Sequence, residues 1–204
     1  MKMTHGRLLR VLASCAFLFW ACSAKAQWEI DGTRSAVNFV SIKNNSVAEI
    51  HSFASLLGYV SVDGKVQLTI SLDSVKTLID IRDQRMRELL FETATFPTAT
   101  ITAAIDPAVL AAIAEGGTVL TEVPVTLSLH GKERSLTVPM AVVGEGGGRM
   151  QVYSLRPVIV NAADFGLDAG VAALQKVAGL QAISTAVPVT FNLAFSSGNF
   201  SSGK

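Results

Sequence analysis

The sequence predicts an all-β protein, an antiparallel eight-stranded barrel with two or three short helices. Three observations predict it: segments that alternate apolar and polar residues, turn residues between those segments, and only three stretches with helical spacing. A strand that alternates in this way buries one face and exposes the other. A closed barrel is favoured over a flat sheet because closure removes the exposed strand edges.

The predicted strands fall into two groups. In the clearest strand of the more regular group, Val66, Leu68, Ile70 and Leu72 alternate with polar residues. Segments 125–129, 135–142 and 187–195 alternate in the same way. Less regular strands are expected near residues 37–42, 53–62, 99–105 and 150–160.

The predicted connections are mostly hairpins. Residues 62–65 and 130–133 contain Asp-Gly and His-Gly turns between apolar runs. The glycine run 144–148 has some likeness to a phosphate loop, but Arg149 stands where the last glycine of that motif belongs. We therefore interpret it as a flexible hairpin.

Helical spacing appears at about 79–91, at 107–116 and at 169–178. The second of these begins with Asp106 as N-cap and a proline at the first helical position. These helices are expected to pack on the barrel.

The N-terminus has the features of a signal peptide. Basic residues precede an apolar run of 12 residues, 11–22, and small residues Ala24 and Ala26 come before Gln27. The run is too short to span a bilayer, which needs about 20 residues. Cleavage after Ala26 is expected, leaving 27–204 as one domain exported to the periplasm. Lipidation at Cys22 is the alternative, which the bulky residues before it disfavour.

Composition excludes several function classes. Both cysteines, Cys15 and Cys22, lie in the leader, so the mature chain has no disulfide and no thiol chemistry. The leader carries four of the 17 basic residues and none of the 16 acidic ones, which leaves 13 against 16, or a net charge of −3. A nucleic-acid partner is not indicated.

No catalytic motif is apparent. The mature chain lacks GxSxG, HExxH and P-loop patterns, and it holds only two histidines, His51 and His130. Neither a metal site nor a cofactor is expected, and the sequence predicts a protein that is not an enzyme.

Several motifs give the chain a family resemblance. The segment 71–97, with Ser71-Leu72-Asp73, Ile81-Arg82-Asp83 and Phe96-Pro97, resembles the central signature of the YceI-like family. Supporting motifs are Trp28-Glu29-Ile30-Asp31, Leu127-Ser128-Leu129-His130-Gly131 and Ala163-Asp164-Phe165-Gly166. The resemblance covers essentially the whole mature chain.

The resemblance implies a lipocalin-like barrel whose lumen holds a polyisoprenoid or another long amphiphile. The chain departs from the family pattern near the expected mouth, where Arg34, Lys43 and His51 replace commoner residues. These departures affect the head-group chemistry of the ligand more than the barrel.

The candidate ligand-binding residues are of two kinds. Arg82 and Arg85 could form a cationic fork for an anionic head group, with Asp83 orienting Arg82. For the charged residues of this helix as a group, a solvated face is the favoured interpretation, with Arg82 and Arg85 as the exceptions. His51 could be a polar group at the lumen's edge, although a structural role is favoured even there. The apolar candidates, any of which could be core instead of ligand wall, are Phe39, Phe53, Leu57, Leu90, Phe96, Ile101, Leu127, Met140, Phe165 and Phe191.

Two functions follow from these features. The first is a periplasmic carrier that binds an isoprenoid, quinone or fatty-acyl chain and makes transient contact with a membrane. The alternative is a structural or stress-response module whose barrel is filled by side chains and which acts through protein contacts. An eight-stranded barrel is compatible with both, because its interior is just wide enough for side chains or one slim ligand.

Overall fold

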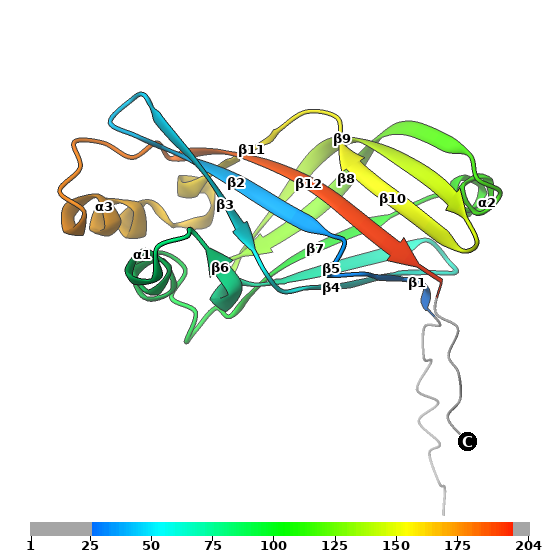
Figure 1. Ribbon diagram of the computed structural model, residues 1–204, viewed down its shortest axis with the longest axis horizontal. Helices are drawn as coiled ribbons and strands as arrows, with labels where there is room; N and C mark the ends of the chain where they lie inside the picture. Colours follow the sequence, from blue (N-terminus) through cyan, green and yellow to red (C-terminus); the bar gives the residue numbers. More distant parts are fainter. Residues whose placement is uncertain (1–25, 198–204) are drawn as a thin grey trace, which may run out of the picture.

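The computed structural model describes residues 26–197. The predicted signal peptide lies outside the described residues apart from Ala26, so its cleavage stays a prediction. The described chain folds into an elongated barrel with helices at its two ends (Figure 1).

Twelve strands form one antiparallel sheet. They are β1 (Ala26–Ile30), β2 (Ala36–Lys43), β3 (Val47–Phe53), β4 (Leu56–Ser61), β5 (Lys65–Ser71), β6 (Val75–Lys76), β7 (Thr98–Ala104), β8 (Thr118–Leu129), β9 (Lys132–Gly146), β10 (Arg149–Ser154), β11 (Val158–Asn161) and β12 (Ala186–Ser196).

Eight of these strands close a ring, in the order β1-β4-β5-β7-β8-β9-β10-β12, with β12 pairing back onto β1. The other four continue neighbouring strands. β1 and β2 pair with successive stretches of β12. In the same way, β3 and β4 follow one another beside β2 and β1, and β6 and β5 follow one another beside β3 and β4. The predicted eight-stranded antiparallel barrel is therefore confirmed.

The hairpins follow the predicted turns. Leu129 pairs with Lys132 across a two-residue loop of His130 and Gly131, both with positive φ. This conformation matches the twist of the flanking strands and suits glycine. The glycine run 144–148 connects β9 to β10, since Gly146 pairs with Arg149. It is a hairpin, as predicted.

The helices lie at opposite ends of the barrel (Figure 1). α1 (Asp80–Arg85) continues into a π-helical turn, Met86–Leu90, and lies at one end with α3 (Asp168–Val177). α2 (Pro107–Ala114) lies at the other end and is capped by Asp106, whose Oδ1 accepts a hydrogen bond from the Ala108 N–H. All three predicted helices are confirmed.

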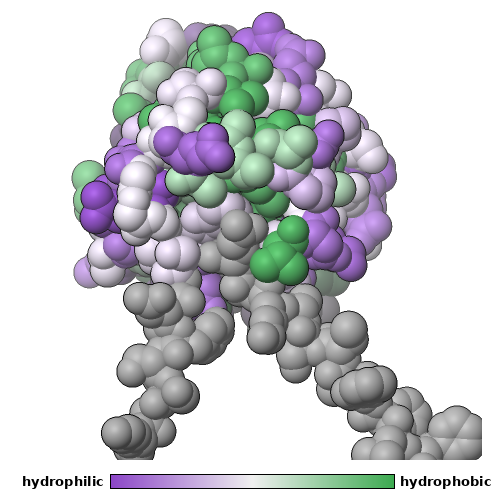
Figure 2. Space-filling view, turned by 90° about the vertical axis from the view of Figure 1, so that its right-hand side faces the viewer, coloured by the Kyte–Doolittle hydropathy of each residue, from purple (hydrophilic) through white to green (hydrophobic). Residues whose placement is uncertain are grey.

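Viewed from the α2 end, hydrophilic and apolar residues are interspersed over the visible surface (Figure 2). Among the helices of the described residues, none has the length and apolar character needed to cross a membrane.

The helices of the α1 end pack closely on one another. A Cβ added to Gly170 in α3 would lie 2.6 Å from the carbonyl oxygen of Leu89 and 2.8 Å from the Leu90 Cα. Only glycine fits that approach without a shift of backbone. The close contact fixes Leu90 against the interior of the barrel.

Candidate functional site: an apolar cavity behind a polar cluster

The barrel encloses a cavity of about 300 Å³. Its wall is made by the inward residues of the strands, and Thr121 is the only polar residue among the 37 that line it. β7 illustrates the pattern, because Ala99, Ile101 and Ala103 face the cavity while the residues between them face outward. Such a wall has almost no hydrogen-bonding capacity.

The cavity extends along the barrel between the helices of the two ends. Val109 and Leu110 of α2 contribute at one end. Leu90, Phe91 and Val171 contribute at the other, from the π-helical turn, its C-cap and α3. An elongated apolar chain is the shape that such a space accepts.

Seven of the ten predicted apolar residues line the cavity. They are Phe39, Phe53, Leu90, Ile101, Leu127, Met140 and Phe191. Sequence reasoning missed Val109 and Leu110, because nothing in a helix pattern shows that the helix covers the end of a barrel. The alternation of β9 and β12 could have identified Val138, Val142 and Val189, which also line it.

Three predicted residues are placed elsewhere. Leu57 is 69% exposed, whereas its neighbour Leu56 is 5% exposed and faces inward. The prediction took residues 53–62 as one strand, but β3 ends at Phe53 and β4 begins at Leu56, and this break reverses which residues face inward. The prediction that Leu57 lines the cavity was therefore wrong.

Phe96 and Phe165 also lie off the cavity wall. Phe96 precedes β7 and packs its ring on His130, with the ring centroids 4.3 Å apart. Phe165 is fully buried in the 3-10 turn Ala162–Phe165 and belongs to the core around the cavity. Phe165 is buried and Phe96 is half-buried, and their aromatic character alone could not distinguish packing from a ligand wall.

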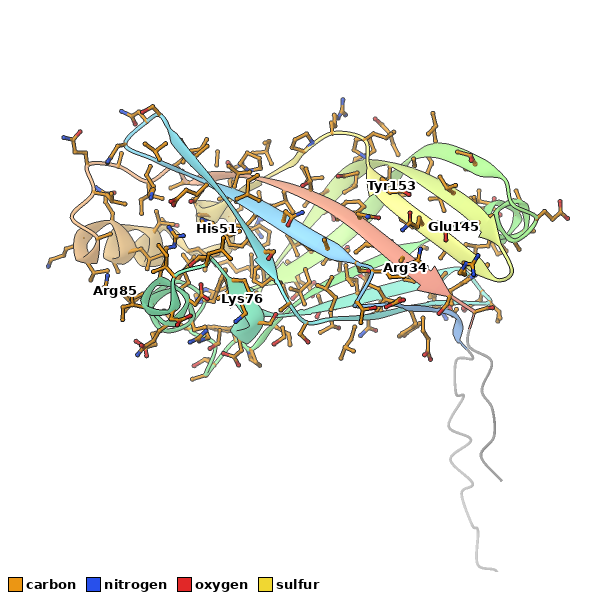
Figure 3. All side chains as sticks on the ribbon, in the orientation of Figure 1. Arg34, His51, Lys76, Arg85, Glu145 and Tyr153 are labelled. Atoms are coloured by element: carbon orange, nitrogen blue, oxygen red, sulfur yellow. The ribbon has the colours of Figure 1, made fainter. Side chains whose placement is uncertain are left out.

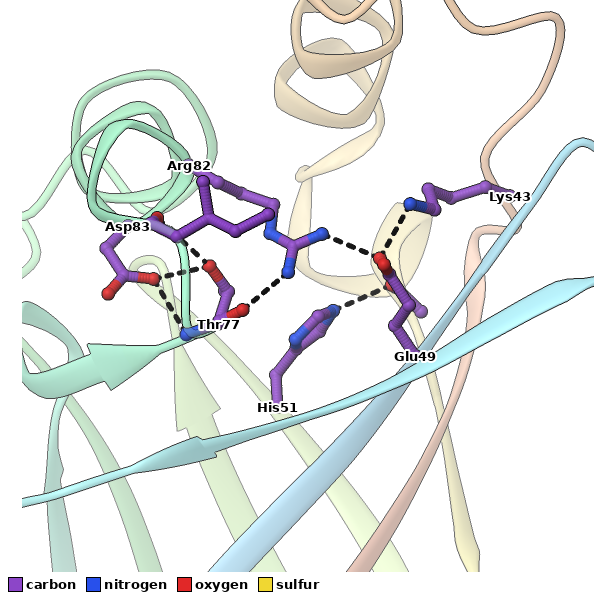
Figure 4. Close-up of polar contacts among 8 residues, drawn as sticks. Lys43, Glu49, His51, Thr77, Arg82 and Asp83 are labelled. Carbon is purple, nitrogen blue, oxygen red and sulfur yellow. Dashed lines mark hydrogen bonds and ion pairs between the residues drawn. The ribbon is translucent and has the colours of Figure 1, made fainter.

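A polar cluster lies at the α1 end of the barrel (Figure 4). The Arg82 guanidinium donates to Glu49 Oε2 at 2.6 Å and to the Thr77 carbonyl at 2.5 Å. Lys43 Nζ lies 2.7 Å from the same Glu49 oxygen. Lys43 and Arg82 together lower the pKa of Glu49, so this carboxylate stays ionised between two cations.

Asp83 has a different partner from the one expected. Its buried carboxylate accepts hydrogen bonds from the Thr77 N–H at 2.7 Å and the Thr77 hydroxyl at 2.6 Å. Glu49, not Asp83, orients Arg82. Asp83 instead fixes the loop that precedes α1.

The expected cationic fork is not formed. Both terminal nitrogens of Arg82 are engaged, one by Glu49 on β3 and the other by the Thr77 carbonyl in the loop before α1. Arg85 has no hydrogen bond or ion pair with any residue in the described part of the chain. The two arginines therefore share no partner, and Arg82 is not a solvated surface residue.

His51 lies beside the cavity wall, on the same face of the sheet as Phe39. It pairs with Phe39 across the β2–β3 ladder, and its ring centroid lies 5.2 Å from that of Phe39, which lines the cavity. Its Nε2 shares a hydrogen bond with the Ser41 hydroxyl at 2.8 Å, and its Nδ1 is buried without a partner. His51 thus contacts a residue of the cavity wall without lining the cavity itself, and its predicted place at the lumen's edge stays a prediction.

Burial lowers the pKa of His51 below its ordinary value of 6.5, and the nearby Arg82 lowers it further. As the pH falls, the unfolded chain takes up this proton before the native protein does. The stability that neutral His51 confers is thus present above pH 6.5 and lost as the pH falls below it.

We expect the free energy of unfolding to decrease on acidification below pH 6.5, by up to about 1.4 kcal/mol per pH unit. The decrease should be weaker in His51→Gln. Urea titrations across this range measure it, and an equal pH dependence in the parent and His51→Gln would contradict the assignment.

Within the described residues, no group of three His, Cys, Asp or Glu side chains is close enough to hold a metal ion.

Comparison with known proteins agrees with this architecture. The family profile of the YceI-like domain matches residues 28–195. The chain belongs to the YceI-like family. No curated protein matches the chain.

Solved structures of YceI-like and related proteins share the fold. A polyisoprenoid binding domain from Saccharophagus degradans, implicated in plant cell wall breakdown, is 41% identical with a TM-score of 0.83, and the match covers 85% of this chain and 100% of that domain. BcnA from Burkholderia cenocepacia is 22% identical with a TM-score of 0.62, covering 81% and 98%. The Campylobacter jejuni YceI protein is 14% identical with a TM-score of 0.51, covering 73% and 85%. The last two are evidence of a common fold alone.

Proposed function

We propose that this YceI-like protein is a periplasmic carrier that holds a long apolar chain in its barrel. The chain would be a polyisoprenoid, a quinone tail or a fatty-acyl group. The observation that carries the proposal is the apolar cavity of about 300 Å³. Its volume lies at the lower end of the range for small-molecule sites, about 300–1,000 Å³.

The energetic cost of such a cavity favours a ligand over the structural alternative. A cavity costs about 24 cal/mol per Å³, so 300 Å³ left unfilled would cost roughly 7 kcal/mol. That is a large fraction of the 5–15 kcal/mol by which typical proteins are stable. A purely structural barrel could be filled with larger side chains, for example at Ala99 and Ala103.

An alkyl chain gains free energy in this cavity from burial alone. Each buried methylene contributes about 0.8 kcal/mol, so ten contribute roughly 8 kcal/mol before the costs of association. The similarity to a polyisoprenoid binding domain at 41% identity supports this ligand class and a binding role rather than catalysis.

The polar cluster supports a position for the head group. His51 Nδ1 and Arg82 Nε are buried polar atoms without a partner, and both belong to this cluster. Lys43 and Arg82 both contact Glu49, and the buried carboxylate of Asp83 brings the formal charge of the cluster to zero, so the two unpartnered nitrogens are what favours an acceptor here. A head group with an anionic oxygen would complete this arrangement.

Organic extraction of the purified exported protein, followed by mass spectrometry, tests the carrier function. We expect one class of long-chain lipid in near-stoichiometric amount. Protein that carries no lipid, and that takes up none when incubated with polyprenyl phosphate, quinone or fatty acid, would favour the structural module.

The head-group position makes a separate prediction. Arg82→Gln should weaken binding of a fatty acid or polyprenyl phosphate about tenfold more than binding of a neutral quinone, because it removes a charged hydrogen bond. Arg134→Gln is the control, since Arg134 is exposed and bonds only to the carbonyl of its neighbour Glu133. Displacement of a fluorescent fatty acid measures both, and equal losses for the two ligand types would refute the position.

A further inference from the structure

Exposed aliphatic side chains occur on β3 and in the segment from Leu78 to Ile81, next to residues of the polar cluster along the chain. Leu78 is 94% exposed and Ile50 is 71% exposed, and Ile79 and Ile81 are also exposed. Ile50 lies two residues before Ser52 on β3, and Leu78 lies two residues after the Lys76 that pairs with Ser52. We call Ile50, Leu78, Ile79 and Ile81 the aliphatic patch.

The local sequence at the patch is poor for stability. Leu78 has a φ of 64°, in the left-handed region that branched residues rarely adopt. Ile79 is the N-cap of α1 and provides no side-chain hydrogen bond, at a position where Ser, Thr, Asp or Asn is preferred. Local conflicts of this kind are expected at functional positions.

The patch is held in place by the neighbouring polar contacts. Asp83 binds the backbone N–H and the hydroxyl of Thr77, the residue before Leu78. Arg82 binds the carbonyl oxygen of the same threonine. The loop is thus ordered with Leu78 exposed, and a partner would not have to order it first.

Cations without an ion-pair partner lie at the same end of the barrel as the patch. Lys76, Arg85 and Arg87 have no ion-pair partner among the residues that the structure describes. Lys76 and Arg85 both lie at the α1 end of the barrel (Figure 3). Of the nearby acidic residues, Glu49 and Asp83 are engaged in the polar cluster, which leaves Asp80 and Glu88.

We propose that the aliphatic patch docks on an anionic lipid bilayer, with its side chains inserted at the level of the head groups. Aliphatic side chains bordered by cations have the pattern of an interfacial anchor. A second copy of the chain fits less well, because four side chains are far fewer than the 20–30 residues that each side of a stable interface contributes. α1 leads directly into Leu90 and Phe91 of the cavity wall, so docking places this end of the cavity next to lipid.

Co-sedimentation of the exported protein with vesicles tests the docking. The parent should bind vesicles of phosphatidylethanolamine and phosphatidylglycerol more tightly than vesicles of phosphatidylcholine. The double variant Leu78→Asn, Ile81→Gln should bind at least roughly tenfold more weakly. Asparagine suits a left-handed backbone, so this variant should remain folded. Lys76→Gln with Arg85→Gln should remove the preference for the anionic vesicles.

Matched controls are available elsewhere on the barrel. Leu120→Ser, at the start of β8 next to α2, removes a leucine that is 68% exposed and should leave vesicle binding unchanged. Equal binding by the parent and the double variant, or no binding by either, would overturn the proposal. So would a dimer of the parent in sedimentation velocity that the double variant abolishes, because a second copy would then cover the patch.

The purpose of the docking rests on the proposed carrier function, but the contact does not. Extracted lipid and vesicle binding are measured on the same preparation. Cargo without vesicle binding refutes the docking alone, and vesicle binding without cargo refutes the carrier alone.

Discussion

Leu127→Asp is expected to abolish retention of the apolar cargo. Leu127 is buried on β8 and faces the cavity, so a carboxylate there loses its hydration and finds no polar partner in the wall. Ser128→Asp, the next residue on the same strand, points to the other face of the sheet and should retain the cargo. Lipid that copurifies with each variant, measured by extraction and mass spectrometry, distinguishes them.

Because Leu127→Asp could also prevent folding, Ala103→Phe provides a second variant without a charge. It places a large ring in the cavity and should reduce cargo by filling the space. Ala104→Phe adds the same ring to the exposed face of β7 and serves as its control. Folded Leu127→Asp and Ala103→Phe proteins that retain parental amounts of lipid would show that cargo lies outside the barrel.

The second large effect is expected for Asp83→Ala. The substitution removes a buried carboxylate that accepts two hydrogen bonds from Thr77. It leaves those donors unsatisfied, and we expect a loss of about 3 kcal/mol in the free energy of unfolding. Asp83→Asn, whose amide oxygen can still accept both bonds but without the negative charge, should lose about half as much.

Urea denaturation of the two Asp83 variants measures these losses. Asp80→Ala is the control, because Asp80 is exposed on the same helix. A change below about 0.5 kcal/mol for Asp83→Ala would place it among ordinary surface substitutions and contradict the role assigned to its contact with Thr77.

The barrel could be predicted from the sequence because its strands are two-sided. In β9, Leu136, Val138, Met140 and Val142 alternate with residues that face outward, and all four line the cavity. Alternation also predicted the positions of the hairpins, because each turn sequence lies between two runs of alternating residues. The prediction failed at Leu57, where the two-residue break between β3 and β4 shifts the alternation by one.

The polar cluster could be predicted only in part. The sequence indicated Arg82 and His51 as candidate ligand-binding residues. Glu49 lies 33 residues from Arg82, and no local sequence pattern connects these two residues. Their contact depends on α1 packing against the end of β3. The aliphatic patch was missed for a related reason, because Leu78, Ile79 and Ile81 have the residue types of a buried helix face.

The central claim is that the cavity itself holds the chain of the ligand. A crystal structure of the exported protein loaded with a polyprenyl phosphate or a fatty acid tests this claim most directly. The account predicts continuous elongated density between Leu110 at the α2 end and Leu90 at the α1 end, with the polar end of the ligand beside Arg82. A cavity without ligand density, with the lipid bound on the outer surface of the barrel, would contradict it.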